Sequence, residues 1–465
     1  MQVDSQYSRW LWFILIVGFI LRIAYTISQP TDGLLYGADG GDTAWYLANG
    51  WGFFSGQPHG WIRNIPFYLS TLPTAPFYIL YAGIFQQLFP DEVVILTIRV
   101  SQCVVSIITA YLGYRIGWRI TDDRRIGFVA CVLLSFHPAF IIEPSNIATE
   151  TFYIFFLTMG FWLYIEYVIH LPKIESNSRL SPTVWIILVG IAFGLGTLTR
   201  AVLLLFPIGI VIHMLMIGWR NQLGLWFRRG LLLLIVYSAV VLTWTFYNWG
   251  MWGTVIIGSN QLMPAIWRGA VQNDGTPAQN DALLLDDPDA VNPDSCEVDC
   301  KYQHSTETYV EQISETINEN IGGFIIFRLS ELAKSYLQPH GTTPLGNVSI
   351  REELIDEVKD DRAFGDFLSL LKTEGFIIKL IVWGFHYLGI GFGLIGMWLT
   401  RRSWQLTLPL IGFVIYTTLV HFVLLALPRY IFPVEVPLLI FSAVTLVTLW
   451  DKFRRSATHL DATIQ

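Results

Sequence analysis

Two aspartates, Asp39 and Asp42, stand in a glycine-rich stretch between apolar segments, in the sequence GADGGDTAWYLANGWGFFSG at residues 37–56. A carboxylate at the edge of an apolar environment can serve as a general base that takes a proton from a hydroxyl. Asp42 and Tyr46 are four residues apart, so a helix would place them on one face. The same residues also predict a turn in which Asp42 is the N-cap of a helix beginning at Thr43, and both interpretations can hold for one residue.

Two further acids, Glu143 and Glu150, bracket the short polar stretch EPSNIATE between apolar segments. One interpretation is that both are solvated acids of a loop. The other is that Glu150 opens the next helix and points back at the same pocket as Asp42. The residues alone leave both interpretations open.

Two arginines stand beside apolar segments. Arg200 lies between GIAFGLGTLT and VLLLFPIGIVI, and Arg429 lies with Tyr430 in LPRYIFPVEVP. An arginine inside a membrane costs a few kcal/mol unless it is paired or lies at the interface. Each is therefore either an interfacial residue whose head reaches water, or a clamp for a phosphate or carboxylate. Two arginines and several acids on one face would fit an anionic lipid headgroup and an activated hydroxyl.

The composition is that of a membrane protein. The chain has 465 residues, of which only 14% are charged, and a soluble domain has roughly a quarter. Its mean hydropathy is +0.49. A formal net charge of −7 argues against a nucleic-acid partner. Four cysteines are too few for a disulfide scaffold, although Cys296 and Cys300, four residues apart in a turn-rich stretch, are a plausible oxidised pair.

Repeated apolar runs predict the fold class, an all-α polytopic membrane protein with about ten transmembrane helices. The predicted spans are 10–27, 93–114, 126–142, 151–170, 183–199, 201–217, 230–247, 376–399, 404–425 and 431–450.

The positive-inside rule orients these spans. Basic residues cluster after the second, sixth, eighth and tenth spans, at Arg115, Arg119, Arg124, Arg125, Arg220, Arg228, Arg229, Arg401, Arg402, Lys452, Arg454 and Arg455. With these clusters in the cytoplasm, the spans alternate and both termini lie inside. Counting the run 73–89 as a further span would break this alternation, so we expect a juxtamembrane helix there, at the outer leaflet.

This topology divides the chain into three parts. Residues 1–247 form an N-terminal transmembrane module, whose first outer loop, 28–92, carries Asp42. Residues 248–375 form an external loop or small domain, and residues 376–465 form a C-terminal transmembrane module. Within the external part, residues 271–320 hold twelve acids and one basic residue, and nothing in the sequence assigns a function to this acidic loop. The polar residues singled out above all fall on the outer side, which indicates one site there.

Several motifs carry a family resemblance when they are taken in chain order. They are GDTAWYLANGWGFFSG after the first span, PTAPFYILYAGIFQQLFP, FHPAFIIEPSNIATETFYIFF, GIAFGLGTLTRAVLLLFP, YNWGMWGTVIIGSNQLMPAIWRG and LPRYIFPVEVPLL. The ordered set resembles the GT-C glycosyltransferases, and within them the family 39/83-like group of protein mannosyltransferases and aminoarabinose transferases. The resemblance covers nearly the whole chain except about 270–375.

The resemblance implies a function. Such an enzyme moves a sugar, with inversion, from a polyprenyl-phosphate donor to a hydroxyl of a lipid, glycan or protein. The expected location is the plasma (inner) membrane, with membrane lipids around the spans and the site on the periplasmic or extracellular side. Asp42 would be the catalytic acid that accepts the proton of the hydroxyl, with Asp39 or Glu150 as a second acid. In many relatives an acid follows the catalytic one directly, whereas Thr43 follows Asp42 here.

The resemblance also assigns the donor site. Arg200, Arg429 and Tyr430 would bind the donor phosphate. The substrate pocket would be lined by Tyr46, Tyr78, His137 and Asn248. His137, in a His–Pro pair at the end of the third span, also fits a purely structural role. The resemblance assigns no cofactor; it is compatible with a divalent metal, but no ligand spacing in the sequence calls for one.

Two other classes of protein compete with this interpretation. A polytopic lipid or polysaccharide transporter, or flippase, would place ionisable residues at mid-membrane and show internal repeats. An accessory membrane subunit would use the acidic loop to bind a partner and perform no chemistry. Substitution of Asp42 separates the enzyme from both, because only the enzyme would lose sugar transfer while keeping its fold.

Overall fold

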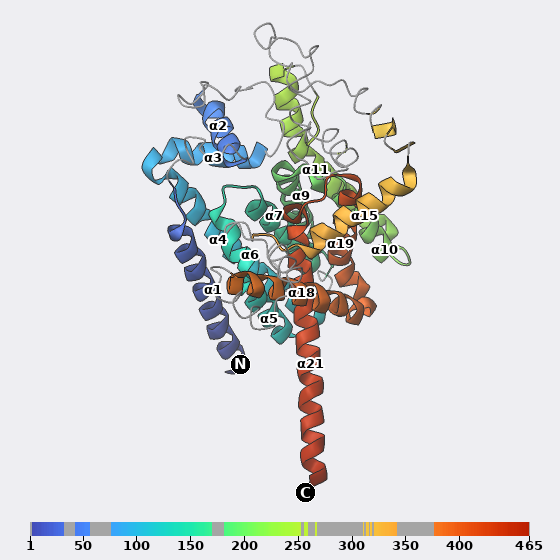
Figure 1. Ribbon diagram of the computed structural model, residues 1–465. Helices are drawn as coiled ribbons and strands as arrows, with labels where there is room; N and C mark the ends of the chain where they lie inside the picture. Colours follow the sequence, from blue (N-terminus) through green and yellow to red (C-terminus); the bar gives the residue numbers. More distant parts are fainter. Residues whose placement is uncertain are drawn as a thin grey trace.

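The computed structural model describes residues 2–31, 42–55, 76–169, 181–252, 255–258, 320–341 and 376–464, with a few isolated positions between 266 and 318. The described residues form helices and connecting turns, with no strand among them (Figure 1).

Nine of the described segments are long and apolar enough to cross a membrane. They lie mainly on α1 (Gln2–Ser28), α4 (Asp91–Thr121), α7 (Glu150–Leu163) with its continuation η3 (Tyr164–Ile169), α9 (Pro182–Thr199), α10 (Phe206–Gly218), α11 (Leu223–Trp252), α18 (Phe376–Leu399), α19 (Trp404–Val423) and α21 (Glu435–Ile464). A bent pair brings the number to ten if it is counted as one span. The prediction of a polytopic protein with about ten membrane helices is confirmed.

The bent pair corrects one predicted span. Residues 126–142 were expected to form a single helix, but α5 (Arg124–Phe136) ends before His137 and α6 (Pro138–Ile142) continues at an angle of 60°. Proline lacks the N–H that would continue the helix, and it forces the preceding residue into an extended conformation. His137 has φ −64° and ψ 125°. The short 3₁₀ turn η2 (Glu143–Ser145) follows α6.

Two short helices, α2 (Asp42–Ser55) and α3 (Pro76–Leu88), lie at the end of the bundle opposite to both termini (Figure 1). We call this end the distal end. α3 has 13 residues; at about 1.5 Å per residue this length is well short of the roughly 30 Å of a bilayer core. The expectation that the run 73–89 does not span is therefore confirmed.

α2 and α3 pack with their backbones in contact. A Cβ atom on Gly83 would lie 2.5 Å from the carbonyl oxygen of Gly50. Any larger residue at either position would push the two helices apart. This close packing fixes α2, and with it Asp42, on the distal end.

The two termini lie at the same end of the molecule (Figure 1), which agrees with ten spans if the bent pair is counted as one. Ion pairs tie the helices together there. Arg125 at the start of α5 bonds Asp451 of α21 at 2.7 Å, and Arg115 and Arg119 of α4 both bond Glu166. α4 extends seven residues beyond the predicted end of its span, to Thr121, because these paired arginines continue the helix past the apolar part.

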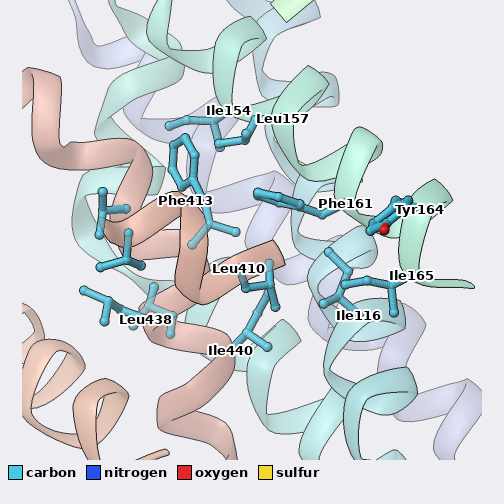
Figure 2. Close-up of a cluster of buried hydrophobic side chains, with 14 of the residues drawn as sticks. Ile116, Ile154, Leu157, Phe161, Tyr164, Ile165, Leu410, Phe413, Leu438 and Ile440 are labelled. Atoms are coloured by element: carbon cyan, nitrogen blue, oxygen red, sulfur yellow. The ribbon is translucent and has the colours of Figure 1, made fainter. Parts of the chain in front are cut away.

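The interior of the bundle is apolar and drawn from helices far apart in sequence (Figure 2). The labelled side chains come from α4, α7, η3, α19 and α21: Ile116, Ile154, Leu157, Phe161, Tyr164, Ile165, Leu410, Phe413, Leu438 and Ile440. Elsewhere small residues allow close helix contact, as is common in membrane proteins. A Cβ on Gly396 of α18 would overlap the carbonyl oxygen of Phe441 in α21.

One helix of the predicted external part, α15 (Ile321–Leu337), lies against the bundle. Its side chains are distributed in the reverse of the order usual for a soluble helix, with a charged residue buried and an apolar one exposed. Arg328 is buried and donates to backbone carbonyls at the end of α19, including that of Phe422 at 2.9 Å, whereas Ile326 is 70% exposed. The carbonyls at a helix C-terminus lack partners within the helix, so Arg328 satisfies groups that would otherwise be unpaired. α15 is therefore anchored to the distal end of α19.

Candidate active site

Asp42 and Arg429 form an ion pair that joins the first and last distal segments of the chain. Nη1 of Arg429 donates to Oδ2 of Asp42 at 2.6 Å, across 387 residues of sequence. Both side chains are about half exposed, 52% for Asp42 and 41% for Arg429. α2 begins at Asp42, one residue earlier than expected, and the carboxylate bonds this distant arginine. The pair is charged, accessible and close to the bundle.

The segment that carries Arg429 owes its shape to prolines. After α19, the backbone is extended at Leu427, and Pro428 starts a four-residue helix, α20 (Pro428–Ile431). Proline suits a first helical position because its missing N–H would have no partner there. The adjacent Tyr430 hydroxyl accepts a hydrogen bond from Nη2 of Arg429 at 3.1 Å. The guanidinium of Arg429, which this short helix carries, is thus held in place beside Asp42.

A second ion pair lies beside the first but is buried. Arg200 stands between α9 and the 3₁₀ turn η4 (Ala201–Leu203), and its Nη1 donates to Oε1 of Glu150 at 2.6 Å. The side chains are 14% and 6% exposed. The guanidinium carbon of Arg200 lies 4.9 Å from the ring centre of Tyr430, and that of Arg429 lies 5.0 Å from it. Tyr430 therefore connects the two pairs. Glu150 is neither a solvated loop acid nor far from Asp42.

The tyrosines predicted for the pocket lie together beneath α2. The rings of Tyr46 and Tyr78 are 5.0 Å apart, and the hydroxyl of Tyr78 donates to Gln102 at 2.7 Å. Burial raises the pKa of Tyr46 above its ordinary value, and the nearby carboxylates of Glu150 and Asp42 raise it further. Tyr46 is therefore neutral at physiological pH and can donate a hydrogen bond near both acids.

The stretch 143–149, which we call the 143–149 turn, is bonded to several helices. Nε2 of Gln102 in α4 donates to the carbonyls of Pro144 at 2.9 Å and Asn146 at 2.7 Å. From α2, Thr43 donates to the carbonyl of Ile147 at 3.3 Å. Thr43 directly follows Asp42, and the turn leads into Glu150. The hydrogen bond from Thr43 to the turn therefore links the segments that carry the two acids.

A carboxylate–histidine pair that sequence reasoning missed lies on this turn. Nε2 of His340, which follows α15, contacts Oε2 of Glu143 at 2.7 Å, and Asn146 donates to the same oxygen at 3.1 Å. Burial by itself would lower the pKa of His340, but the Glu143 carboxylate outweighs it and raises that pKa above its ordinary value. Glu143 was assigned no role from the sequence, and His340 gave no signal because its partner is 197 residues away.

Deeper in the bundle, Glu435 stands between two histidines. Nδ1 of His386 lies 2.9 Å from Oε1 of Glu435, and Nε2 of His137 lies 3.6 Å from Oε2. Nε2 of His386 donates to the carbonyl of Tyr336 in α15 at 2.7 Å. His137, one of the predicted pocket residues, is thus enclosed between α5, α6 and α21. Ionisable residues inside apolar helices are the sequence signal that would have found His386 and Glu435.

The remaining expected residues are placed as follows. Asn248 in α11 is fully buried; its Nδ2 donates to the carbonyl of Trp244 at 2.9 Å, and its Oδ1 has no hydrogen-bond partner in the described part of the chain. Asp39, Cys296 and Cys300 lie outside the described residues. Among the residues that the structure describes, no three His, Cys, Asp or Glu side chains are grouped as metal ligands would be.

Comparison with known protein families shows which family the chain belongs to. The profile of the dolichyl-phosphate-mannose-protein mannosyltransferase family matches residues 12–253, more than half of the chain. The chain belongs to this family. The matched part of this mannosyltransferase-family protein includes Asp42, Glu150 and Arg200, whereas Arg429 lies beyond it.

One solved structure supports the fold. The chain is similar to the oligosaccharyltransferase of Archaeoglobus fulgidus in its apo form, with a TM-score of 0.52 and 14% identity, over 98% of this chain and 52% of that one. A second structure, the archaeal oligosaccharyltransferase AglB from the same organism with an inhibitory peptide and a dolichol-phosphate, has a TM-score of 0.49, 12% identity and the same coverage. The chain spans about half the length of these proteins. No curated protein matches it. The predicted GT-C fold is confirmed.

Proposed function

We propose that the protein is a glycosyltransferase that moves a sugar from a polyprenyl-phosphate donor to a hydroxyl acceptor at the outer face of the plasma membrane. The observation that carries the proposal is the half-exposed Asp42–Arg429 pair, which offers a carboxylate and a guanidinium side by side at the distal end of the bundle. Membership of a family named for a lipid-phosphate-linked mannose supports the donor class. The acceptor remains a lipid, glycan or protein hydroxyl.

The pair suggests how donor binding would prepare the base. A guanidinium binds phosphate as readily as carboxylate, through charge-assisted hydrogen bonds. When the donor phosphate binds, Arg429 would turn from Asp42 to the phosphate oxygens. This exchange frees Oδ2 of Asp42 at the moment when a donor is present. In the donor-free protein the same contact keeps both side chains at the site.

The transfer itself would be a single displacement. The acceptor oxygen attacks the anomeric carbon while Asp42 takes the hydroxyl proton. The bond between the anomeric carbon and the phosphate oxygen breaks, and the lipid phosphate leaves with one more negative charge than it had in the donor. Arg429 stabilises this developing charge. Attack opposite to the leaving group inverts the anomeric configuration.

The second pair would support the first. Arg200 is bonded to Glu150 and covered by Tyr430, so it adds positive charge behind the phosphate and holds the aromatic ring against which Arg429 lies. Glu150 balances that charge while the site is empty. Tyr46, which reaches Thr149 and faces both acids, would orient the acceptor hydroxyl or the sugar.

The proposal is tested with purified protein in lipid vesicles and a panel of polyprenyl-phosphate sugars carrying labelled mannose, glucose or pentose. We expect label to move from the lipid phosphate into an acceptor with inverted configuration, and free polyprenyl phosphate to appear in equal amount. Cleavage of no donor in the panel, with acceptor-containing membranes present, would refute the proposal.

One observation favours the competing class. Glu435 and His386 are ionisable, buried and within membrane helices, as is typical of transporters. A lipid flippase would move the labelled donor between leaflets and leave its sugar–phosphate bond intact. The same vesicles distinguish the two, because only the transferase releases free polyprenyl phosphate.

A further inference from the structure

The 143–149 turn is held at its first residue by His340, a residue of the segment between the seventh and eighth predicted spans. The side-chain hydrogen bonds described above reach this turn from Thr43 in α2 and Gln102 in α4. His340 therefore links the turn to a part of the chain that the first four spans do not contain. The contact with Glu143 joins the segment that follows α15 to this turn.

His340 is itself fixed by its neighbours. The carbonyl of Tyr336 accepts from His386, and the carbonyl of Leu337 accepts from Tyr387 at 2.9 Å, so α18 holds the end of α15. Gly341 follows with φ +81°, a conformation that favours glycine, and packs on Ala139 of α6. The imidazole is thus presented to Glu143 from a backbone bonded on one side and sharply turned on the other.

Charge explains why the contact matters. Glu143 and Glu150 are both buried and only seven residues apart, and Arg200 is bonded to Glu150. Glu143 is bonded to the neutral Asn146 and to His340. A buried carboxylate without a cation is costly, and breaking such a pair destabilises its surroundings strongly. Burial raises the pKa of Glu143. If His340 lost its charge, Glu143 would therefore either take up a proton or be reached by water through an opened turn, and both changes would alter the contact that holds the turn.

His340 also touches the other side of the site. Its ring centre lies 4.7 Å from that of Phe432, three residues after Arg429. One imidazole therefore lies between the turn that leads to Glu150 and the segment that carries Arg429. Movement of either would change the spacing of Asp42 and Arg429, because Thr43 is bonded to the same turn.

We propose that protonated His340 is a positioning residue for sugar transfer, holding the 143–149 turn, through Glu143, in the geometry that aligns Asp42 with Arg429. This inference rests on the proposed function. The groups that face His340 are Glu143 from η2, Glu150 from α7 and Glu435 from α21, and all three favour its charged form. Glu150 is itself paired with Arg200, and Glu435 with His386.

The proposal gives a pH signature. The positioning contact is present below the pKa of His340 and is lost as pH rises through it. Turnover of the wild-type protein should therefore fall on the alkaline side. His340→Gln keeps an N–H donor of similar reach but cannot carry charge, so its turnover should be low already at about pH 6 and should lack that alkaline fall.

The experiment compares wild type, His340→Gln and His213→Gln, the last as a matched control. His213, in α10, is also a buried histidine, and its Nδ1 lies 2.8 Å from the hydroxyl of Tyr164. Turnover and the KM for labelled polyprenyl-phosphate sugar are measured from about pH 5 to about pH 9. Hydrogen exchange of the peptide covering 143–150 is measured in parallel. For His340→Gln we expect turnover about ten- to a hundredfold lower at acidic pH, with KM changed less than about threefold, and faster exchange.

The outcomes are separable. An unchanged alkaline fall and unchanged exchange in His340→Gln would overturn the proposal, as would equal changes in His213→Gln. If wild type transfers no sugar but exchange still depends on His340, the proposed function fails first, and His340 is then a structural contact and not a positioning residue. Loss of the alkaline fall together with faster exchange, in His340→Gln alone, supports the proposal.

Discussion

The two arginine–carboxylate pairs at the distal end have the same chemistry and the same N–O distance, 2.6 Å, but different surroundings. Asp42–Arg429 is about half exposed, and Glu150–Arg200 is mostly buried. An exposed pair contributes about 0–1 kcal/mol and can be exchanged for another anion, whereas removing one partner of a buried pair costs roughly 3–5 kcal/mol. The difference in burial, at equal distance, therefore indicates different roles: the exposed pair is an exchangeable site, and the buried pair is a fixed support.

Substitution of Asp42 tests the proposed role of the exposed pair and should have the largest effect. We expect Asp42→Asn to lower sugar transfer at saturating donor by at least about a hundredfold, the usual scale for a lost general base. Stability should stay within about 1 kcal/mol, because asparagine is nearly as good as aspartate at a helix start and the lost ion pair is exposed. Transfer in vesicles and unfolding in detergent give the two readouts.

Asp451→Asn is the matched control, because Asp451 also pairs with an arginine on an exposed surface, at the opposite end. We expect it to transfer normally. Near-normal transfer by Asp42→Asn would show that the wrong carboxylate has been chosen, and Asp39 and Glu150 would then be the next candidates.

The buried pair should respond in the opposite way. Arg200→Ala leaves Glu150 charged and buried, so the free energy of unfolding should fall by roughly 3–5 kcal/mol, whereas Arg429→Ala should change it by less than about 1 kcal/mol. Replacing both partners, as Arg200→Met with Glu150→Gln, should recover part of the loss. Unfolding in detergent is measured for wild type and these three variants. Equal losses for Arg200→Ala and Arg429→Ala would contradict the distinction between the pairs.

A smaller effect is expected from pH. The pKa of His340 is raised in the folded protein, so its contact with Glu143 contributes stability that is complete below the ordinary histidine value of about 6.5. This contribution is lost as pH rises through the folded value. The melting temperature of His340→Gln should therefore lie below that of wild type near pH 6 and approach it near pH 9. A difference that does not depend on pH would contradict this account.

The sequence predicted the elements and the charged residues better than their partners. Apolar runs locate spans because about 20 such residues are needed to cross a bilayer, and Arg200 and Arg429 stood out because charge beside a span needs a reason. Which acid each arginine binds could not be predicted, since Asp42 and Arg429 meet only when helices far apart in sequence pack together. His340 was missed for the same reason, and its neighbourhood is polar, so no contrast marked it.

Boundaries also depended on local chemistry that apolar runs do not report. The span expected at 126–142 bends at His137, because the following proline ends one helix and begins another. α4 continues to Thr121 because Arg115 and Arg119 find Glu166 on a neighbouring helix. Hydrophobicity locates the part of a helix that lies in lipid, whereas paired charges stabilise the turns of helix beyond that apolar part.

The central claim is that Arg429 exchanges Asp42 for a lipid phosphate, and a double-mutant cycle tests it directly. Binding of a short-chain polyprenyl phosphate is measured for wild type, Asp42→Asn, Arg429→Ala and the double variant. We predict that Asp42→Asn binds the lipid phosphate several-fold more tightly than wild type, because the competing carboxylate is gone, and that this gain disappears in the Arg429→Ala background. Equal affinity of wild type and Asp42→Asn, or the same gain with and without Arg429, would contradict the account.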